Sequence, residues 1–560
     1  MTRFFTLTAI LITAATTLAQ PDLVLLDANI HTVDPDRPRA QAMAIEDGAI
    51  TAVGSNDDIL QLVGKGTRVD RLNGATVLPG LIDAHGHLGG LGSLSTGVVD
   101  LAGTTSYDEV IQRVVDRAAE TPEGEWILGR GWDHESWSSR ELPTHDRLSE
   151  AVPNHPVWLS RVDGHAALGN AEAMRRAGVD ASAESPAGGE VIRTANNKPT
   201  GVFVDNAETL VARAIPNDIF ADSVKVTLAA QERCLSAGLT GVHDMGVSPQ
   251  LADLYKKMAD SGELKLRVYA VLSAAYAVRY FDQNEPYAGE RVQVRACKLY
   301  MDGAMGSRGA WLLEPYDDRK TDDAGEPYTG LAVSEVGLIE SVAAHGLQRG
   351  YQVCTHAIGD RANREVLDAY ARAAESTGLD LADARFRVEH AQMLHPDDIP
   401  RFAQLGVLPS MQPKHATSDM RWVADRIGDE RALGTYAWAA LLQTGIPIPA
   451  GSDFPVEPHE PLRGFCAAVT RQDETGYPEG GWLAHERMTR EEALRSMTLD
   501  AAKAAFMEDL VGSLTPGKRA DFVVLTHDIM TVEPAEILKT RVVRTYIDGE
   551  MVYADGFWPE

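Results

Sequence analysis

Short apolar runs alternate with longer helical patterns through most of this 560-residue chain. Such alternation is typical of a parallel sheet whose strands are joined by helices. Eight runs have the length of buried strands, and eight parallel strands can close into a barrel. These runs lie near residues 76–84, 239–245, 266–273, 294–301, 351–356, 385–390, 406–412 and 446–453. The predicted fold class is therefore α/β, with a (β/α)8 barrel of the TIM type.

The gap between the first two runs, about residues 90–235, is far too long for an ordinary strand-to-helix connection. It predicts an inserted subdomain after the first barrel strand. Both ends of the chain contain short strands around turn residues, with Asp548-Gly549 as a tight-turn signal near the C-terminus. We expect the ends to form one small β-sandwich domain from residues 20–72 and 508–560, around a barrel at 73–507.

The first residues have the layout of a signal peptide. Arg3 precedes an apolar run at 4–18, and Thr17-Leu18-Ala19 supplies small residues for cleavage after Ala19. The alternative, an anchoring helix, fits less well because the run is short for a bilayer and threonines interrupt it. We therefore expect residues 1–19 to be removed and the protein to be exported, periplasmic or secreted, with no later membrane-spanning segment.

The charge balance narrows the classes of partner. The net charge is −29, from 52 basic and 81 acidic residues, whereas nucleic-acid and anionic-lipid binding need a basic surface. The four cysteines are scattered and resemble no zinc motif, so we interpret them as buried thiols with one disulfide possible. A small-molecule substrate is the expected partner. Homodimers are common among such barrels, but no sequence feature identifies an interface.

Polar residues with metal-binding side chains follow the predicted strands. His85 and His87 are two residues apart in an extended segment, so their side chains point the same way and can hold one metal ion. The wider set at strand ends is His85, His87, Lys298, His356, His390 and Asp453. A lone histidine or a bare His-x-His is a weak signal. Their occurrence in one order, each on a predicted strand of one barrel whose active site lies at that rim, favours a metal centre.

Several segments resemble the amidohydrolase superfamily over nearly the whole mature chain. PGLIDAHGH at 79–87 is similar to its first-strand motif, and GSLTPGKRADFVVL at 512–525 to its return into the split β domain. Other segments resemble the amidohydrolase family 3 subgroup, which includes N-substituted formamide deformylase. These are KLYMDGAMGSR (298–308), THAIGDRA (355–362), RVEHAQ (387–392), SMQP (410–413) and GSDFPV (451–456). The motifs are specific for the superfamily but not for a substrate.

The resemblance implies a binuclear site. One ion would be held by His85, His87 and Asp453, and the other by His356 and His390. Lys298 would bridge the two as a CO2-derived carbamate, because an ammonium cannot bind a cation whereas a carbamate oxygen can. The alternative is that Lys298 pairs with Asp302 at the rim, which would leave a site for one ion. Two divalent ions are expected, and zinc suits these ligands.

The implied reaction is hydrolysis of a non-peptide, amide-like C–N bond by a hydroxide that bridges the metals. Asp453 would accept the proton of the attacking water and deliver it to the leaving amine. One alternative is a mononuclear deaminase or lactonase on the same barrel. Another is a non-catalytic binding protein, although such proteins typically lose ligands and all six positions here carry competent residues.

Three other residues are candidates for contact with the substrate. His165 in the insertion could stabilise an oxyanion, or it could be a structural histidine bonded to Asp163. Arg308 could clamp a carboxylate or phosphate of the substrate, although such an arginine more often pairs with a protein acid. Asp133 is a candidate for the pocket wall.

Two further expectations concern carboxylates. Asp205 stands where many relatives of this superfamily are expected to have glutamate, and it either touches the substrate or lies in a surface turn. Strand alternation predicts that Glu389 faces away from His390 and from the site.

Overall fold

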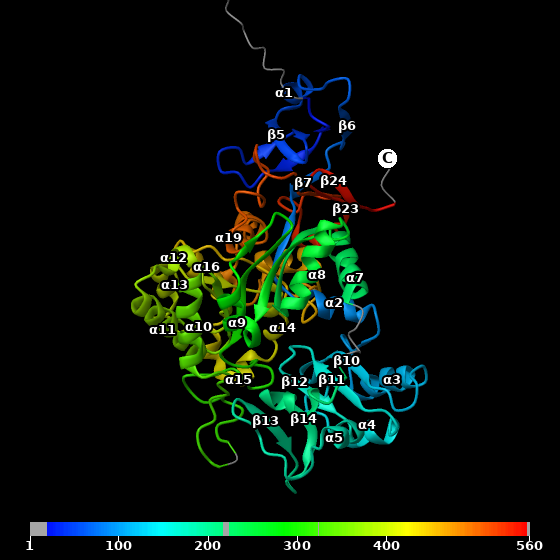
Figure 1. The fold of residues 1–560 in the computed structure, drawn as a ribbon, viewed down its shortest axis with the longest axis vertical. Helices are drawn as coiled ribbons and strands as arrows, with labels where there is room; N and C mark the ends of the chain where they lie inside the picture. The colour runs from blue at the N-terminus through cyan, green and yellow to red at the C-terminus, as the bar shows by residue number, and fades with distance from the viewer. Residues whose placement is uncertain (1–19, 217–222, 323, 557–560) are drawn as a thin grey trace, which may run out of the picture.

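The computed structural model describes residues 20–216, 223–322 and 324–556, and three parts lie along its longest axis (Figure 1). The barrel is in the middle. Two sheets lie at one end of the barrel, one of blue N-terminal strands and one that combines blue and red strands from both ends of the chain. The cyan insertion lies at the opposite end. The predicted signal peptide, residues 1–19, lies outside the described residues and stays a prediction.

Seven parallel strands form the barrel sheet, and each pairs with the next barrel strand along the chain. They are β8 (Leu81–Gly86), β15 (Leu239–Val247), β16 (Arg267–Ser273), β18 (Val292–Tyr300), β19 (Gln352–Ala357), β20 (Arg387–His390) and β21 (Leu408–Ser410). A short strand, β17 (Tyr287–Ala288), pairs antiparallel with β18 beside this path. The strands are buried almost throughout, as apolar runs covered on both faces should be. The predicted α/β fold with a TIM-type barrel and an additional sheet domain is confirmed.

The eighth position of the barrel is extended chain instead of a regular strand. Residues 446–453 were expected to form a strand, but Pro447 and Pro449 have no N–H to donate to a ladder. The segment still closes the ring, because Ala450 forms a parallel bridge with Met411 on one side and accepts from the Ala84 N–H at 3.1 Å on the other. This closure carries Asp453 to the rim beside β8.

The run expected as one barrel strand at 76–84 is two strands in different sheets. β7 (Thr76–Pro79) pairs with the terminal strands, and β8 begins the barrel. Gly80 separates them at a close approach: a Cβ there would lie 2.2 Å from the Thr240 Oγ1. The chain passes from one sheet into the other at this residue. The residue is glycine because no larger side chain fits against Thr240.

Two sheets are built from the ends of the chain. The four-stranded sheet has the order β5 (Ala49–Gly54), β4 (Ala42–Glu46), β1 (Leu23–Leu26) and β6 (Arg68–Arg71). The six-stranded sheet has the order β24 (Glu550–Ala554), β23 (Val542–Ile547), β22 (Phe522–Leu525), β7, β2 (Asn29–His31) and β3 (Arg39–Ala40). Buried residues of both sheets, including Leu25 and Val524, form one hydrophobic cluster. Buried Arg267 of the barrel strand β16 forms hydrogen bonds with Asp521 and Asp548, and these bonds connect the sheets of the chain ends to the barrel.

The insertion contains a six-stranded sheet and short helices. Its strands have the order β13 (Gly189–Arg193), β14 (Pro199–Asp205), β12 (Ala166–Gly169), β11 (Val157–Arg161), β10 (Ile127–Trp132) and β9 (Val99–Asp100). Helices α3 (Tyr107–Ala118), α4 (His145–Ala151) and α5 (Ala171–Ala177) accompany it. α3 begins where the Ser106 side chain accepts the Glu109 N–H, and it buries Val110 and Val114 one turn apart. The sheet therefore has a core of its own, which holds its loops over the barrel rim.

Helices surround the barrel (Figure 1). The longest, α11 (Asp360–Thr377), buries Val366, Tyr370 and Ala373 at helical spacing and ends at Gly378, whose φ is 69°. The others include α2 (Leu88–Leu94), α7 (Ser223–Ser236), α8 (Pro249–Asp260), α9 (Ala274–Gln283), α10 (Val336–Arg349), α13 (Ile399–Leu405), α14 (Pro413–Asp419), α15 (Val423–Ala432), α16 (Trp438–Gln443), α17 (Pro461–Thr470), α18 (Arg490–Ser496) and α19 (Leu499–Ala504). In the described ranges none of the helices is long and apolar enough to cross a bilayer. The four cysteines are free and buried.

Candidate metal centre and active site

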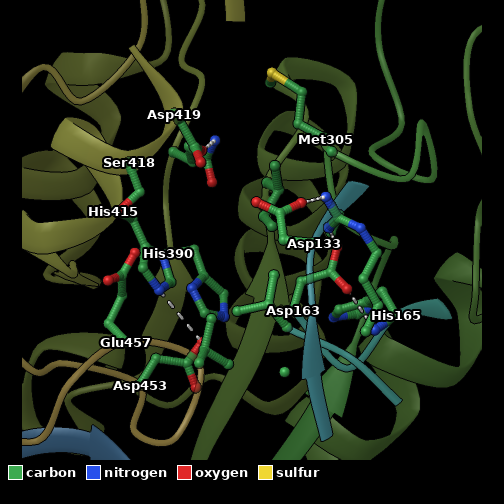
Figure 2. Close-up of a pocket in the computed structure, with 18 of the residues that line it drawn as sticks. Asp133, Asp163, His165, Met305, His390, His415, Ser418, Asp419, Asp453 and Glu457 are labelled. Carbon is green, nitrogen blue, oxygen red and sulfur yellow. Dashed lines mark hydrogen bonds and ion pairs between the residues drawn. The ribbon is translucent and has the colours of Figure 1, made fainter. Parts of the chain in front are cut away.

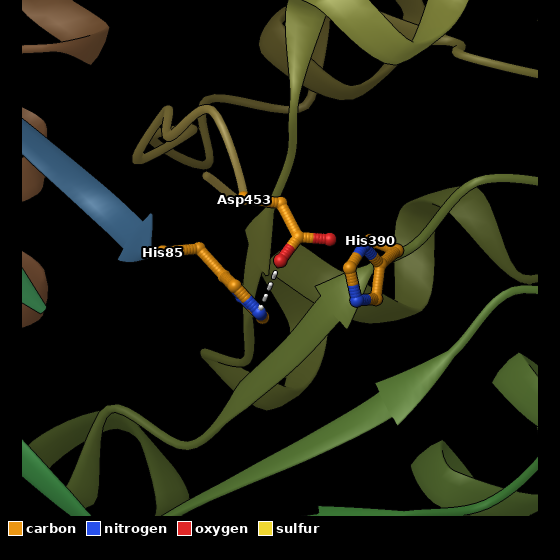
Figure 3. A group of neighbouring side chains, drawn as sticks. All are labelled: His85, His390 and Asp453. Carbon is orange, nitrogen blue, oxygen red and sulfur yellow. Dashed lines mark ion pairs between the residues drawn. The ribbon is translucent and has the colours of Figure 1, made fainter. Parts of the chain in front are cut away.

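The predicted ligand residues gather at the C-terminal rim of the barrel. Ligand atoms of His85, His390 and Asp453 all lie within 4.8 Å of one another (Figure 3). The His87 Nε2 is 3.1 Å from the Asp453 Oδ1, and the His356 ring centre is 4.5 Å from that of His390. The structure thus places side chains from β8, β19, β20 and the closing segment in one cluster.

Hydrogen bonds orient three of the histidines. The Nδ1 of His85 lies 2.6 Å from Glu389, that of His87 3.0 Å from the Met245 carbonyl, and that of His390 2.7 Å from the Gln412 Oε1. Each bond engages Nδ1 and leaves Nε2 as the nitrogen that a metal could use, which is the arrangement of metal-binding histidines. Burial lowers the pKa of His85 to about 4, and burial also holds the pKa of His390 well below its usual value. Both rings are therefore neutral at pH 7 and can donate a lone pair to a metal.

Asp453 is the acceptor at the centre of the cluster. Its Oδ1 is buried and, among the described residues, has no hydrogen-bond donor, although His85 and His87 nitrogens lie 3.6 and 3.1 Å away. Its φ of 62° is in the left-handed region, as is the φ of 72° at His390. Such backbone strain in non-glycine residues clusters at functional sites. An orphaned buried carboxylate oxygen among neutral imidazoles fits a divalent cation in both charge and donor type.

Lys298 points into this cluster from β18. Its Nζ lies 3.2 Å from the His85 Nε2 and 5.0 Å from the centre of the Tyr300 ring. It makes no ion pair with Asp302, the partner in the alternative interpretation. Instead, Asp302 accepts the backbone N–H groups of Trp311, Ile358 and Gly359. Burial lowers the pKa of Lys298, which favours the neutral amine that reacts with CO2.

The prediction that Glu389 faces away from the site is wrong. Glu389 points into the barrel and contacts His85, and buried Arg387 pairs with it at 2.7 Å. The alternation rule fails because His390 has positive φ, which ends the extended strand and redirects its side chain over the rim. Glu389 is therefore a positioning residue for His85. His243, which fits no ligand position, lies nearby and bonds Arg387 at 2.9 Å.

His165 reaches the cluster from the insertion. Its ring centre is 4.7 Å from that of His356, and its Nδ1 bonds the Asp205 Oδ1 at 2.7 Å. Burial alone would lower the pKa of His165, but the hydrogen bond and charge of Asp205 and the charge of Asp163 raise it to about 9. Asp163 bonds the backbone N–H of His165 and pairs with Arg161. Asp205 thus orients a protonated imidazole beside the predicted ligands.

Two cavities meet at the centre. The first chamber, of about 340 Å³, lies between barrel segments that carry His415, Asp419 and Glu457 and insertion segments that carry Asp133 and Asp163 (Figure 2). The second chamber has about 590 Å³ and extends toward β14 and β18. Both chambers are lined by Asp163, His165, His356, His390, Asp453 and Val456. A substrate can therefore extend to either side of the metal ligands.

The two candidate substrate residues are placed differently. Asp133 lines the first chamber and is held there by an ion pair with buried Arg161. Arg308 lines neither chamber, because its guanidinium forms two hydrogen bonds with Asp318 at 3.2 and 2.8 Å. The structure therefore gives Arg308 a protein partner in place of a substrate.

Sequence reasoning missed several residues of the first chamber. The His415 Nε2 is 3.7 Å from the Asp453 Oδ2 and, in the described ranges, has no hydrogen-bond partner. Asp419 accepts hydrogen bonds from Gln392 and Tyr436, and burial raises its pKa to about 7. His415 and Asp419 belong to α14, which directly follows SMQP at the end of β21. The position of α14 directly after a barrel strand could have indicated these two residues, because the segments that follow the strands line the active sites of such barrels.

Comparisons with known proteins agree with this geometry. The profile of the amidohydrolase family matches residues 69–553. The chain is 34% identical to Protein LONG AFTER FAR-RED 3 of Arabidopsis thaliana, covering 95% of this chain and 91% of that protein. It is 27% identical to N-substituted formamide deformylase of Arthrobacter pascens, covering 95% and 98%. An uncharacterized metal-dependent hydrolase from Pyrococcus horikoshii superposes with a TM-score of 0.72 at 26% identity, covering 91% of this chain and 99% of that one.

Proposed function

This chain belongs to the amidohydrolase family and is a metal-dependent hydrolase, and on that basis we propose that it cleaves a non-peptide, amide-like C–N bond. The observation that carries the proposal is the buried, unpartnered Asp453 Oδ1 beside neutral histidines. The name of the relative from Arthrobacter pascens supports an amide-like bond, because removal of a formyl group from nitrogen breaks such a bond.

The proposed cofactors are two divalent ions, with zinc favoured by the donor set. His85, His87 and Asp453 would hold one, His356 and His390 the other, and a carbamate on Lys298 would serve both. When bound, such ions bring the pKa of water near neutrality and polarise a carbonyl group. The neutral form favoured by the lowered pKa of Lys298 supports the carbamate, since CO2 adds to the free amine.

The proposed proton shuttle is Asp453. Its carboxylate takes a proton from the attacking water and passes it to the nitrogen of the breaking C–N bond. The shared position of Asp453 in both chambers supports this role, because the carboxylate can reach groups on either side of the centre. His165, held protonated by Asp205, donates its N–H to the oxygen that becomes negative when the carbonyl is attacked.

The first experiment is metal content per chain in purified protein, measured with intact mass under gentle conditions. We expect two ions per chain and a carbamate-sized mass increment that disappears in Lys298→Ala, which should keep at most one ion. One ion in the wild-type protein would favour a mononuclear deaminase or lactonase. No ion after reloading with zinc would contradict the proposal and favour a binding protein.

His165→Asn should lower kcat about 10²- to 10³-fold, because it removes a donor to the developing oxyanion. KM and metal content should change little, since His165 is not among the proposed ligands. The measurement is steady-state kinetics on an N-acyl or N-formyl amine found by screening, with metal analysis of the same sample. A loss of bound metal that accounts for the lost rate would contradict the oxyanion role.

A further inference from the structure

Arginines near the metal centre differ in whether they have an acidic partner. Arg161 forms ion pairs with Asp133 and Asp163, and Arg308 bonds Asp318. Arg130 lines the second chamber, but the described part of the chain places no carboxylate within ion-pair distance of its guanidinium. A charged group kept without a counter-ion in a cavity is costly unless a ligand supplies the partner.

Arg130 projects from β10 with most of its donors unused. Its Nη2 donates to the Val162 carbonyl at 3.2 Å, a long bond, and its Nε is buried without a partner among the described residues. A guanidinium carries five N–H groups in a fixed planar fork and stays protonated in proteins. The chamber beside it is also lined by Gly164, which lies close to the guanidinium: a Cβ there would be 3.6 Å from the Arg130 Nη1.

Four acids line the second chamber, and three of them lie against side chains other than Arg130. Asp205 bonds His165 at 2.7 Å, and the Asp453 Oδ1 lies 3.1 Å from the His87 Nε2. Asp163 pairs with Arg161. Burial raises the pKa of Glu208 well above its usual value, which favours its uncharged form. The charges of Asp453, Asp163 and Glu208 act on Arg130 from a distance, but none of these carboxylates forms an ion pair with its guanidinium.

We propose that Arg130 binds a carboxylate of the substrate, so that the enzyme acts on amides with a carboxylate on one half, such as N-acylated amino acids. The inference rests on the proposed function. The planar fork of arginine matches a carboxylate in two parallel hydrogen bonds. The other half of the substrate would occupy the first chamber, where Met305, Ile358 and Trp422 offer an apolar wall.

The reaction balances without any further reagent. Water supplies a hydroxyl to the acyl carbon and a proton to the nitrogen as the C–N bond breaks, giving a carboxylic acid and an amino acid. In this arrangement Arg130 takes no part in the bond changes, and the carboxylate that it holds fixes the scissile bond between the chambers.

Binding is tested on the zinc-loaded enzyme with ligands that it cannot hydrolyse. N-methanesulfonyl-leucine and N-methanesulfonyl-3-methylbutylamine differ only in the carboxylate, and calorimetry gives their dissociation constants. We expect the wild-type enzyme to bind the carboxylate ligand at least about 10-fold more tightly, and Arg130→Met to abolish that preference. The matched control is Arg175→Met, a 69% exposed arginine of the insertion, which should keep it. A preference retained in Arg130→Met, or absent from the wild-type enzyme, would overturn the proposal.

Kinetics separate the failure of this inference from the failure of the proposed function. For N-acetyl-leucine, Arg130→Met should lower kcat/KM by about 10- to 100-fold more than for N-acetyl-3-methylbutylamine, mainly through KM. Arg130→Lys keeps the charge but not the fork, and should give an intermediate loss if Arg130→Met does not fold. Equal losses of kcat/KM on both amides would contradict the carboxylate site but not the proposed function. If the enzyme hydrolyses neither amide but keeps the binding preference, only the proposed reaction is contradicted.

Discussion

Asp453→Asn is expected to lower kcat by about 10³-fold or more, the largest effect of any single substitution at the rim. The change removes a proton shuttle, which typically contributes about 10²- to 10⁴-fold. It also replaces a carboxylate ligand by a neutral amide, while preserving the size of the side chain. The orphaned Oδ1 indicates that the carboxylate is placed for a ligand and not for the stability of the barrel. Steady-state kinetics and metal analysis on the same preparation measure both consequences.

The matched control is Asp419→Asn, which alters another buried acid of the first chamber. Asp419 bonds Gln392 and Tyr436 and contacts none of the proposed ligands, so its loss should reduce kcat/KM by less than about 10-fold. Activity of Asp453→Asn above a tenth of the wild-type value, with full metal content, would show that another group moves the proton. His415, 3.7 Å from the Asp453 Oδ2, would then be the first residue to test.

Much of the barrel follows from local sequence patterns. Runs such as YQVCTH at 351–356 are short, apolar and bounded by turn residues. A strand that is buried on both faces needs such a run whatever its neighbours are, so the pattern alone indicates the strand. The order of the metal-binding side chains along the chain could also be predicted, because parallel strands bring their C-terminal ends to one rim. His85, His356 and His390 lie together for this reason.

The parts that could not be predicted depend on contacts between distant segments. The separation of β7 from β8 at Gly80 depends on the approach of Thr240, about 160 residues later in the chain. The partner of His165 is Asp205 because β12 and β14 pair within the insertion, and no local signal favours it over Asp163. Glu389 was misassigned because alternation describes an extended strand, whereas the next residue has left-handed backbone geometry.

Glu389→Leu should reduce the free energy of unfolding by about 3–5 kcal/mol, the usual cost of leaving one member of a buried ion pair alone. Arg387 and Glu389 are both completely buried, and they lie 2.7 Å apart inside the barrel. Hydrogen bonds from Arg387 to the Ala84 carbonyl and Ser410 would remain, but neither acceptor carries a charge. Denaturant-induced unfolding of both proteins measures the difference. A loss below about 1 kcal/mol would mean that the pair is not structural.

The double variant Arg387→Met/Glu389→Leu separates stability from the positioning of His85. Replacing both members of a buried ion pair by apolar residues is often neutral, so we expect most of the lost stability to return. Metal affinity should nevertheless remain about 10- to 100-fold weaker, because the His85 Nδ1 no longer has the carboxylate that fixes its orientation. If affinity returns together with stability, Glu389 acts through the fold alone. If only stability returns, the barrel interior supports the metal centre through the Glu389–His85 hydrogen bond, a contact that a functional metal site would require and that a structural barrel would not.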